Sequence, residues 1–211
     1  MTLDEVIAGI EAAAPVEWQE EWDNSGWQIV DRDPKKIECS GVLFSLDVTE
    51  AAVAEAVREG CNLIVCHHPL LFRGVKRLTG ATAVERLVAE AVRQGIAIYA
   101  AHTNMDVAPG GVNDRLARMF GLEKTEALVP GGQPGVGLGR VGELPEAVPT
   151  GEFLTRIARV LGVPSLRHSE IATETVQRVA VCGGSGGEFI EAALAAGAQL
   201  YLTADLKYHD I

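Results

Sequence analysis

The sequence predicts an α/β protein built of two three-layer-like lobes with mainly parallel sheets. Three observations predict this class. Short apolar runs alternate with segments of helical period between residues 41 and 120. Glycine follows three of these helical segments, at Gly60, Gly95 and Gly121, where helices commonly end. The same alternation returns after a stretch rich in glycine and proline, and alternating strands and helices are typical of βαβ units.

The first lobe is expected over residues 1–127. It opens with a helix over 2–14, because Thr2 and Glu5 have the spacing of a capping box and apolar residues then recur with helical period. A second capping-box pair, Thr82 and Glu85, begins another helix. The remaining elements are strands over 41–47, 62–66 and 96–101 and helices over 48–59, 82–94 and 112–120.

Residues 128–150 are dense in glycine and proline, and we place the lobe boundary in this stretch. It could be a linker or a glycine-bent hairpin. The second lobe is expected over 151–211. Its elements are helices over 153–161 and 188–196 and strands over 176–182 and 199–205.

Composition limits the classes of function. There are 29 acidic residues against 18 basic ones, a formal net charge of −11, which disfavours a nucleic-acid partner held by phosphate neutralisation. No run reaches the ~18 apolar residues that span a bilayer, and the first residues carry acids where a signal peptide carries bases. We therefore expect a cytoplasmic protein whose four cysteines are reduced thiols rather than disulfides or zinc ligands.

Polar residues gather where the predicted strands end. Ligands of open parallel sheets bind beyond the carboxyl ends of strands. The residues found there are Asp47, the pair His67 and His68, the segment 102–106, the glycine loop 183–187 and the segment 205–210. Four of the five histidines belong to this set, and His168 is taken as an ordinary surface or core histidine.

His67 and His68 are candidate metal ligands, with Asp106 as a third. Neighbouring side chains of a regular strand point to opposite faces, but at a strand end bent before Pro69 the two rings can diverge around a cleft, each holding a different ion. Imidazole suits Zn, Cu, Fe and Ni, and carboxylate suits harder ions. The set is compatible with two divalent ions roughly 3.5–4 Å apart. A single histidine at a strand end is more often a hydrogen-bonded structural residue, and the tandem pair weighs against that alternative.

Two other stretches allow more than one interpretation. The glycine loop 183–187 follows a strand, but Phe189 stands where the dinucleotide motif has its last glycine, and no lysine follows as in a P-loop. Room for a ligand, or close packing of a helix on the sheet, explains the loop better. The segment 18–30, with Trp18, Trp22 and Trp27 around an Asp-Asn-Ser-Gly turn, is either pinned to the core or lines a cleft.

Four motifs in order resemble the NIF-three-like family: WDNSGWQI, CHHPLLF, AAHTNMDVAPGGVNDRLA and VCGGSGGEFIEAALAAGAQLYLTADLKYHD. Members of that family are described as dinuclear-metal, hexameric proteins and are named GTP cyclohydrolase 1 type 2 homologues. The resemblance implies that His67, His68 and Asp106 are metal ligands. It also implies two α/β lobes and a toroidal homo-hexamer whose metal sites face an internal cavity.

Two departures from the family pattern stand out. Ala204 replaces a usual glycine, and the sequence ends at Ile211, where the family continues and supplies a further His and a Glu ligand. The second lobe is therefore expected to be incomplete at its C-terminus relative to the family. Three ligands for two ions, whether Zn, Fe, Mn or Mg, lead us to expect that this 211-residue chain holds metal weakly or not at all.

Two functions follow as hypotheses. In the first, a metal-dependent hydrolase opens a nucleotide-like or heterocyclic small molecule, GTP by resemblance, with His102 orienting a metal ligand or acting as acid–base and His209 contacting substrate. In the second, the chain is a non-catalytic, metal-binding hexamer that works as a scaffold or regulatory interaction partner.

Overall fold

The computed structural model describes residues 1–210 and divides into two compact units, Met1–Met105 and Asp106–Ile211. Each unit is described by itself. The division falls at a different place from the 128–150 stretch in which we set the boundary. That stretch belongs to the second unit, where its residues pair as strands of one sheet.

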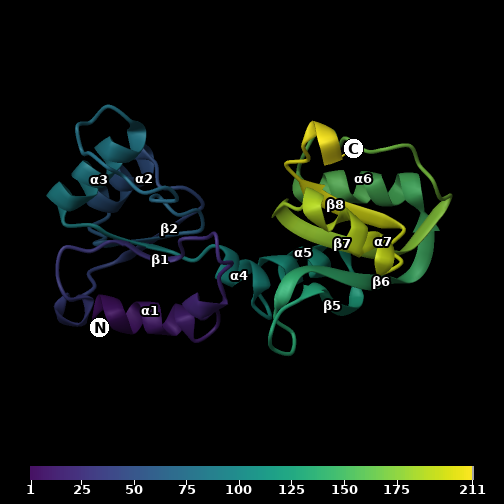
Figure 1. The fold of residues 1–211 in the computed structure, drawn as a ribbon, viewed down its shortest axis with the longest axis horizontal. Coiled ribbons are helices and arrows are strands. Elements are labelled where there is room, and N and C mark those ends of the chain that lie inside the picture. The colour runs from purple at the N-terminus through teal and green to yellow at the C-terminus, as the bar shows by residue number, and fades with distance from the viewer. Residues whose placement is uncertain (211) are drawn as a thin grey trace. The chain divides into compact units, whose positions relative to one another are not determined.

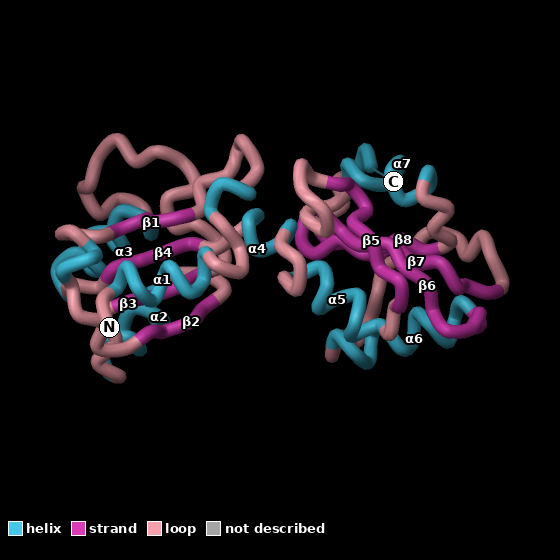
Figure 2. Tube along the Cα trace, turned by 90° about the horizontal axis from the view of Figure 1, so that it is seen from below, coloured by secondary structure: helices cyan, strands magenta, loops and turns pink. Residues whose placement is uncertain are grey.

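The first unit carries one four-stranded sheet in the order β1-β4-β3-β2 (Figure 2). β2–β3 and β3–β4 are parallel pairs and β1–β4 is antiparallel, so this sheet is mainly parallel, as expected. Its elements are α1 Leu3–Glu11, η1 Val16–Trp18, β1 Gly26–Ile29, η2 Pro34–Lys36, β2 Val42–Ser45, α2 Glu50–Arg58, β3 Leu63–Cys66, α3 Ala83–Gln94 and β4 Ala97–Ala100, followed by α4 Thr103–Val107.

Strand β3 is buried on both faces because helices cover both. Leu63 and Val65 pack in a core with α1, whereas Ile64 and Cys66 pack in a second core with α2 and α3. Figure 1 shows the same layers, with α1 below the sheet and α2 and α3 above it. This three-layer arrangement explains why β3 is a continuous apolar run rather than an alternating one.

Strand β1 is an element that the sequence analysis did not predict, as is the short helix α4. Three of the four β1 residues pair antiparallel with β4, with an irregularity between Trp27 and Ile29, and Gly26 lies opposite Ala100. Gly26 has a φ of 103°, in the region that favours glycine, and the chain turns sharply there before entering the strand. The pairing brings the turn that precedes β1 beside the carboxyl end of β4.

The second unit carries a four-stranded sheet in the order β5-β6-β7-β8. The sheet differs in detail from the expected mainly parallel one, because β5–β6 and β6–β7 are antiparallel and β7–β8 alone is parallel. Figure 2 shows α5 and α6 on one side of it and α7 on the other. The elements are α5 Val112–Phe120, β5 Glu123–Pro130, β6 Gly137–Pro149, α6 Thr150–Leu161, β7 Thr175–Ser185, η3 Gly187–Phe189, α7 Ile190–Ala195, β8 Leu200–Ala204 and η4 Tyr208–Asp210.

The glycine-rich stretches of this unit have packing roles. Residues 128–150 form the greater part of the β5–β6 hairpin, one of the two alternatives considered. At Gly183, a side-chain carbon would lie 3.2 Å from both Val112 and Leu116 of α5. At Gly186 it would collide with the hydroxyls of Tyr201 and Thr203 on β8. Close approach of a helix and a strand therefore accounts for these two glycines.

A buried arginine holds the β5–β6 turn together. Arg140 is 2% exposed. Its Nε donates to Asp114, and its two terminal nitrogens donate to the carbonyls of Gly137 at 2.7 Å and Gly139 at 2.7 Å and of Gly135 at 3.3 Å and Ala108 at 3.4 Å. These acceptors match the five N–H donors of a guanidinium. Burial raises the pKa of Asp114, but the hydrogen bonds from Arg140 and from the Gly110 amide outweigh it and lower that pKa.

No helix among residues 1–210 is long and apolar enough to cross a membrane.

We expect Arg140→Met to lower the free energy of unfolding by about 3 kcal/mol or more, because it leaves the Asp114 carboxylate and the carbonyls without donors. Arg140→Lys should also destabilise the protein, since an ammonium cannot reach all of the acceptors. Urea denaturation measures both effects. Arg167→Met, an exposed position in the same unit, is the matched control. Equal stability of Arg140→Met and the control would show that the hydrogen bonds of Arg140 contribute little to the free energy of unfolding.

Candidate metal centre

Three imidazoles meet at the carboxyl ends of two neighbouring parallel strands. His67 and His68 follow β3, and His102 follows β4. One ring nitrogen from each of the three lies within 4.8 Å of the others. The ring centroids are 5.1 Å apart for His67–His68 and for His67–His102, and 5.6 Å apart for His68–His102. The strand end thus turns the tandem pair toward a point that both rings and His102 share.

The backbone fixes the tandem pair. The amides of His67 and His68 donate to the carbonyls of Ser45 at 3.1 Å and Leu46 at 2.9 Å, which extends the β2–β3 ladder by two residues beyond Cys66. Pro69 follows and supplies no amide donor, so the ladder stops there. The positions of the two histidines are therefore set by the sheet rather than by a free loop.

Each of the three rings uses Nδ1 to bind an oxygen acceptor. Nδ1 of His67 lies 2.9 Å from the carbonyl of Ala101, Nδ1 of His68 lies 2.7 Å from Asp47, and Nδ1 of His102 lies 2.8 Å from Asp23. Carbonyl and carboxylate oxygens only accept, so Nδ1 carries the proton in every ring. The lone pair of each neutral ring then belongs to Nε2, as in a histidine that binds a metal ion.

Asp23 is the anchor of the site. Its side chain is 0% exposed, against 16% for His102. Besides the His102 ring, it accepts hydrogen bonds from the Asn24 amide at 2.7 Å, the Ser25 hydroxyl at 2.9 Å, and the amide and hydroxyl of Thr103. Burial alone would raise the pKa of this carboxyl, but the hydrogen bonds, with His102 foremost, outweigh burial and hold the pKa well below its usual range. A fixed negative charge therefore faces the ring of His102.

His67 is electrostatically prepared to stay neutral. Burial lowers its pKa, and the neighbouring His102 and His68 lower it further, against the opposing effects of the Ala101 hydrogen bond and Asp23. A neutral imidazole is the form that binds metal. His67 accordingly stays neutral at a more acidic pH than an ordinary histidine.

Two aromatic side chains flank the imidazoles. The ring centroid of Trp22 lies 6.1 Å from that of His102, and the Phe72 centroid lies 6.3 Å from it. Trp22 and Phe72 also contact each other edge to face, with centroids 6.0 Å apart. Both are largely exposed, at 59% and 47%. The tryptophan-rich segment thus borders the site with Trp22, whereas Trp27 packs against Tyr99 in the core.

Two other predicted site residues, Asp106 and His209, belong to the second unit. Asp106 is in α4 and belongs to the second unit, where Asn113 donates to its carbonyl at 3.0 Å. Its assignment as a ligand stays a prediction. His209 is exposed in η4, with its ring 5.4 Å from Tyr208, and its contact with substrate also stays a prediction. His168 is an exposed surface residue, as expected.

The sequence analysis missed part of the site. It assigned His102 to acid–base chemistry or to the support of a ligand, whereas the structure groups it with His67 and His68 as a candidate ligand. It did not assign roles to Asp23 or Asp47. Asp47 carried a signal, because it ends a strand beside the histidine pair. The signal for Asp23 was the Asp-Asn-Ser-Gly turn, but its partner is 79 residues away and depends on the unrecognised strand β1.

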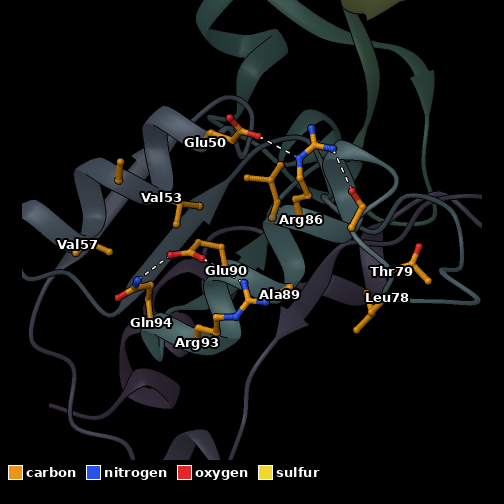
Figure 3. A pocket seen from close by; sticks show the side chains of 13 residues that line it. Glu50, Val53, Val57, Leu78, Thr79, Arg86, Ala89, Glu90, Arg93 and Gln94 are labelled. Carbon is orange, nitrogen blue, oxygen red and sulfur yellow. Dashed lines mark hydrogen bonds and ion pairs between the residues drawn. The ribbon is translucent and has the colours of Figure 1, made fainter.

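A separate hollow of about 710 Å³ lies between α2, α3 and residues 78–80 (Figure 3). Its side chains are held by local pairs, Arg86 with Glu50 at 3.5 Å and Gln94 with Glu90 at 2.7 Å. The residues that line it do not include the clustered imidazoles. This hollow is therefore separate from the histidine cluster.

The residues present suit a divalent ion. Zn–N bonds are about 2.0–2.1 Å long, so tetrahedral nitrogen ligands lie roughly 3.4 Å apart. The observed separations within 4.8 Å require a modest closing of the rings, and His68 has room to move because its side chain is 48% exposed. The acceptors on all three Nδ1 atoms supply the orienting contacts that metal-binding histidines use. The cluster could therefore hold a metal ion.

A comparison with known protein families shows which family this chain belongs to. Residues 1–211 match the family described as Duf34/NIF3, NGG1p interacting factor 3. The chain belongs to the NIF3 family. This confirms the resemblance drawn from the four sequence motifs.

NIF3 relatives match over nearly the whole chain. A Streptococcus pneumoniae protein named GTP cyclohydrolase 1 type 2 homolog is 37% identical over 99% of this chain and 78% of its own length. A Nostoc protein of the same name is 41% identical over 92% of this chain and 77% of its own length. The crystal structure of a Bacillus cereus protein related to NIF3 has a TM-score of 0.89 and 27% identity, covering 100% of this chain and 84% of that one. These matches confirm the α/β fold of the NIF3 family.

We expect Asp23→Asn to weaken Zn²⁺ binding by about 10- to 100-fold, because loss of the charged partner releases the His102 ring from its orientation. Competition with a chromophoric chelator measures the affinity. Asp47→Asn should also weaken Zn²⁺ binding, but by less, because the Asp47 side chain is 57% exposed and the substitution disturbs no buried network. Asp31→Asn, on a distant exposed loop, is the control. If all three variants bind Zn²⁺ as the unaltered chain does, the carboxylates do not support the site.

Proposed function

We propose that this NIF3 protein is a divalent-metal-dependent hydrolase that acts on a nucleotide-like or heterocyclic small molecule. The observation that carries the proposal is the set of three imidazoles, each with Nδ1 on an oxygen acceptor and each with one ring nitrogen within 4.8 Å of the others. The names of the bacterial relatives, GTP cyclohydrolase 1 type 2 homolog, support the substrate class. A bound divalent ion would supply Lewis acidity and would make a water molecule more acidic.

The side chains of this chain have separate tasks in the proposal. His67 and His68 hold the ion from the end of β3, and His102 holds it from the end of β4. Asp23 and Asp47 fix the rings of His102 and His68. The exposed rings of Trp22 and Phe72 border the site and offer apolar surface to a planar substrate.

A dinuclear centre with Asp106 as a further ligand is the finer form of the proposal. We expected weak metal binding from three ligands shared by two ions, and that count did not include His102. With three imidazoles for one ion, we propose that the first equivalent binds firmly and that the second depends on Asp106. Asp106→Asn should then remove the second equivalent and spare the first in a metal titration.

The test of the hydrolase is turnover of GTP with added Mn²⁺, Zn²⁺ or Fe²⁺, followed by chromatography of the products. We expect His67→Ala, His68→Ala and His102→Ala each to abolish turnover and to lower the metal content. His168→Ala, an exposed histidine outside the cluster, should retain both. Inactivity of the metal-loaded chain toward GTP and other heterocyclic substrates would contradict the proposal.

A non-catalytic scaffold is the second candidate. It is favoured by the name of a Saccharomyces cerevisiae relative, NGG1-interacting factor 3, which is 30% identical over 99% of this chain. That name describes an interaction rather than a reaction. Under this alternative, partner binding persists in His67→Ala and no substrate is turned over.

We also propose that the protein is a homo-hexamer located in the cytoplasm. The assembly follows from the family resemblance. Light scattering coupled to size-exclusion chromatography should give six times the 22.4 kDa chain mass. A monomeric mass at micromolar concentration would contradict the hexamer without bearing on the metal site.

A further inference from the structure

The loop after the histidine pair is a cationic segment in an acidic protein. Residues 60–84 contain no aspartate or glutamate, whereas the chain as a whole carries 29 acids. Within this range Arg73, Lys76 and Arg77 occur within five residues, and all three are exposed. Among the residues that the structure describes, none of the three has an acidic partner within ion-pair distance. Their charges are therefore open to an external anion.

This loop, residues 72–82, surrounds a hollow of about 860 Å³. Phe72 and the three basic residues line it. The acid that also lines it, Glu85, is engaged by the Thr79 amide at 2.8 Å, the Thr79 hydroxyl at 2.7 Å and the Ala81 amide at 3.2 Å. These hydrogen bonds, with that of Thr79 foremost, lower the pKa of Glu85 to about 2, so Glu85 is a carboxylate at neutral pH. The three cations Arg73, Lys76 and Arg77 outnumber it in the lining of the hollow.

Hydrogen bonds join the start of the loop to strand β1 and to the turn that precedes it. The Leu71 amide donates to the Gln28 side chain at 3.0 Å, and the Asn24 side chain donates to the Leu71 carbonyl at 2.9 Å. Phe72 is thereby held beside Trp22 and His102, with its ring both on the hollow and 6.3 Å from the imidazole. The aromatic pair and the cations are thus neighbouring parts of one surface next to the histidine cluster.

The aromatic pair and the basic residues together suit a ligand that has both a planar ring and a phosphate. Exposed aromatic rings stack on planar rings whatever their substituents. Unpaired Arg and Lys side chains bind phosphate oxygens. Phe72 and the three basic residues line the same hollow, so one ligand can contact the ring and the cations together. In a chain of net charge −11, a local positive segment also attracts an anion that the rest of the surface repels.

We propose that Trp22 and Phe72 bind the planar ring, and Arg73, Lys76 and Arg77 the phosphate, of a ring compound that carries a phosphate group. This inference rests on the proposed function in that it places the ligand at the same metal site. It adds the residues that recognise the two ends of that ligand. It also requires that the ligand bind when no metal ion is present.

The test is a binding measurement by isothermal titration calorimetry in the presence of a chelator, so that no turnover intervenes. The probes are guanosine 5′-monophosphate, guanosine and ribose 5-phosphate. We expect the monophosphate to bind at least about tenfold more tightly than either fragment. The triple variant Arg73→Gln, Lys76→Gln, Arg77→Gln should bind the monophosphate no more tightly than guanosine. Its affinity for guanosine should equal that of the unaltered chain.

The aromatic half is tested by Trp22→Ala and Phe72→Leu. Each substitution should lower the affinity for the monophosphate and for guanosine by about tenfold or less. The affinity for ribose 5-phosphate should not change. The matched control is Arg32→Gln, Lys35→Gln, Lys36→Gln, which removes the same charge from another exposed loop, where Asp31 and Asp33 pair with Arg32 at 3.3 Å and with Lys36 at 3.6 Å. The control should bind all three probes as the unaltered chain does.

Equal affinity of the unaltered chain for the monophosphate and guanosine, or equal loss in the two triple variants, would overturn this inference. Failure of the hydrolase proposal gives a different result, namely no turnover with added metal while the pattern of binding persists. The two proposals are therefore tested separately.

Discussion

The buried carboxylate of Asp23 accepts hydrogen bonds from His102, Thr103, Ser25 and the Asn24 amide, and the geometry of the candidate metal centre depends on it. A buried charge without such partners would cost several kcal/mol, so the turn and the strand end must both be in place for the carboxylate to be tolerated. The same contacts fix the orientation of the His102 ring. Structural stability and the readiness of the site to bind metal therefore have a common origin in this residue.

The strength of this support differs among the three rings. His102 and its partner Asp23 are largely removed from solvent, whereas His68 and Asp47 are half exposed. His67 relies on a backbone carbonyl, which cannot change its charge. The cluster thus combines two well-fixed ligands with one that retains freedom to adjust.

Much of the first unit could be predicted because its signals are local. The apolar run of β3, the capping residues of α3 and the tandem imidazoles before Pro69 can be recognised within a few neighbouring residues. The antiparallel pairings of the second sheet could not be, since register and direction depend on contacts between segments far apart in the chain. The contribution of Asp23 was hidden for the same reason, because a polar turn residue is ordinary until its distant partner is known.

The pairing of β1 with β4 has a consequence for how the protein is made. Gly26 must wait for Ala100 to emerge from the ribosome before the two strands can meet, and the chain between them has to close a long loop. Until then the first turn has no imidazole to bind, so the nascent N-terminal segment offers no ordered set of ligands. The arrangement that could hold an ion is thereby confined to molecules in which the edge of the sheet is complete.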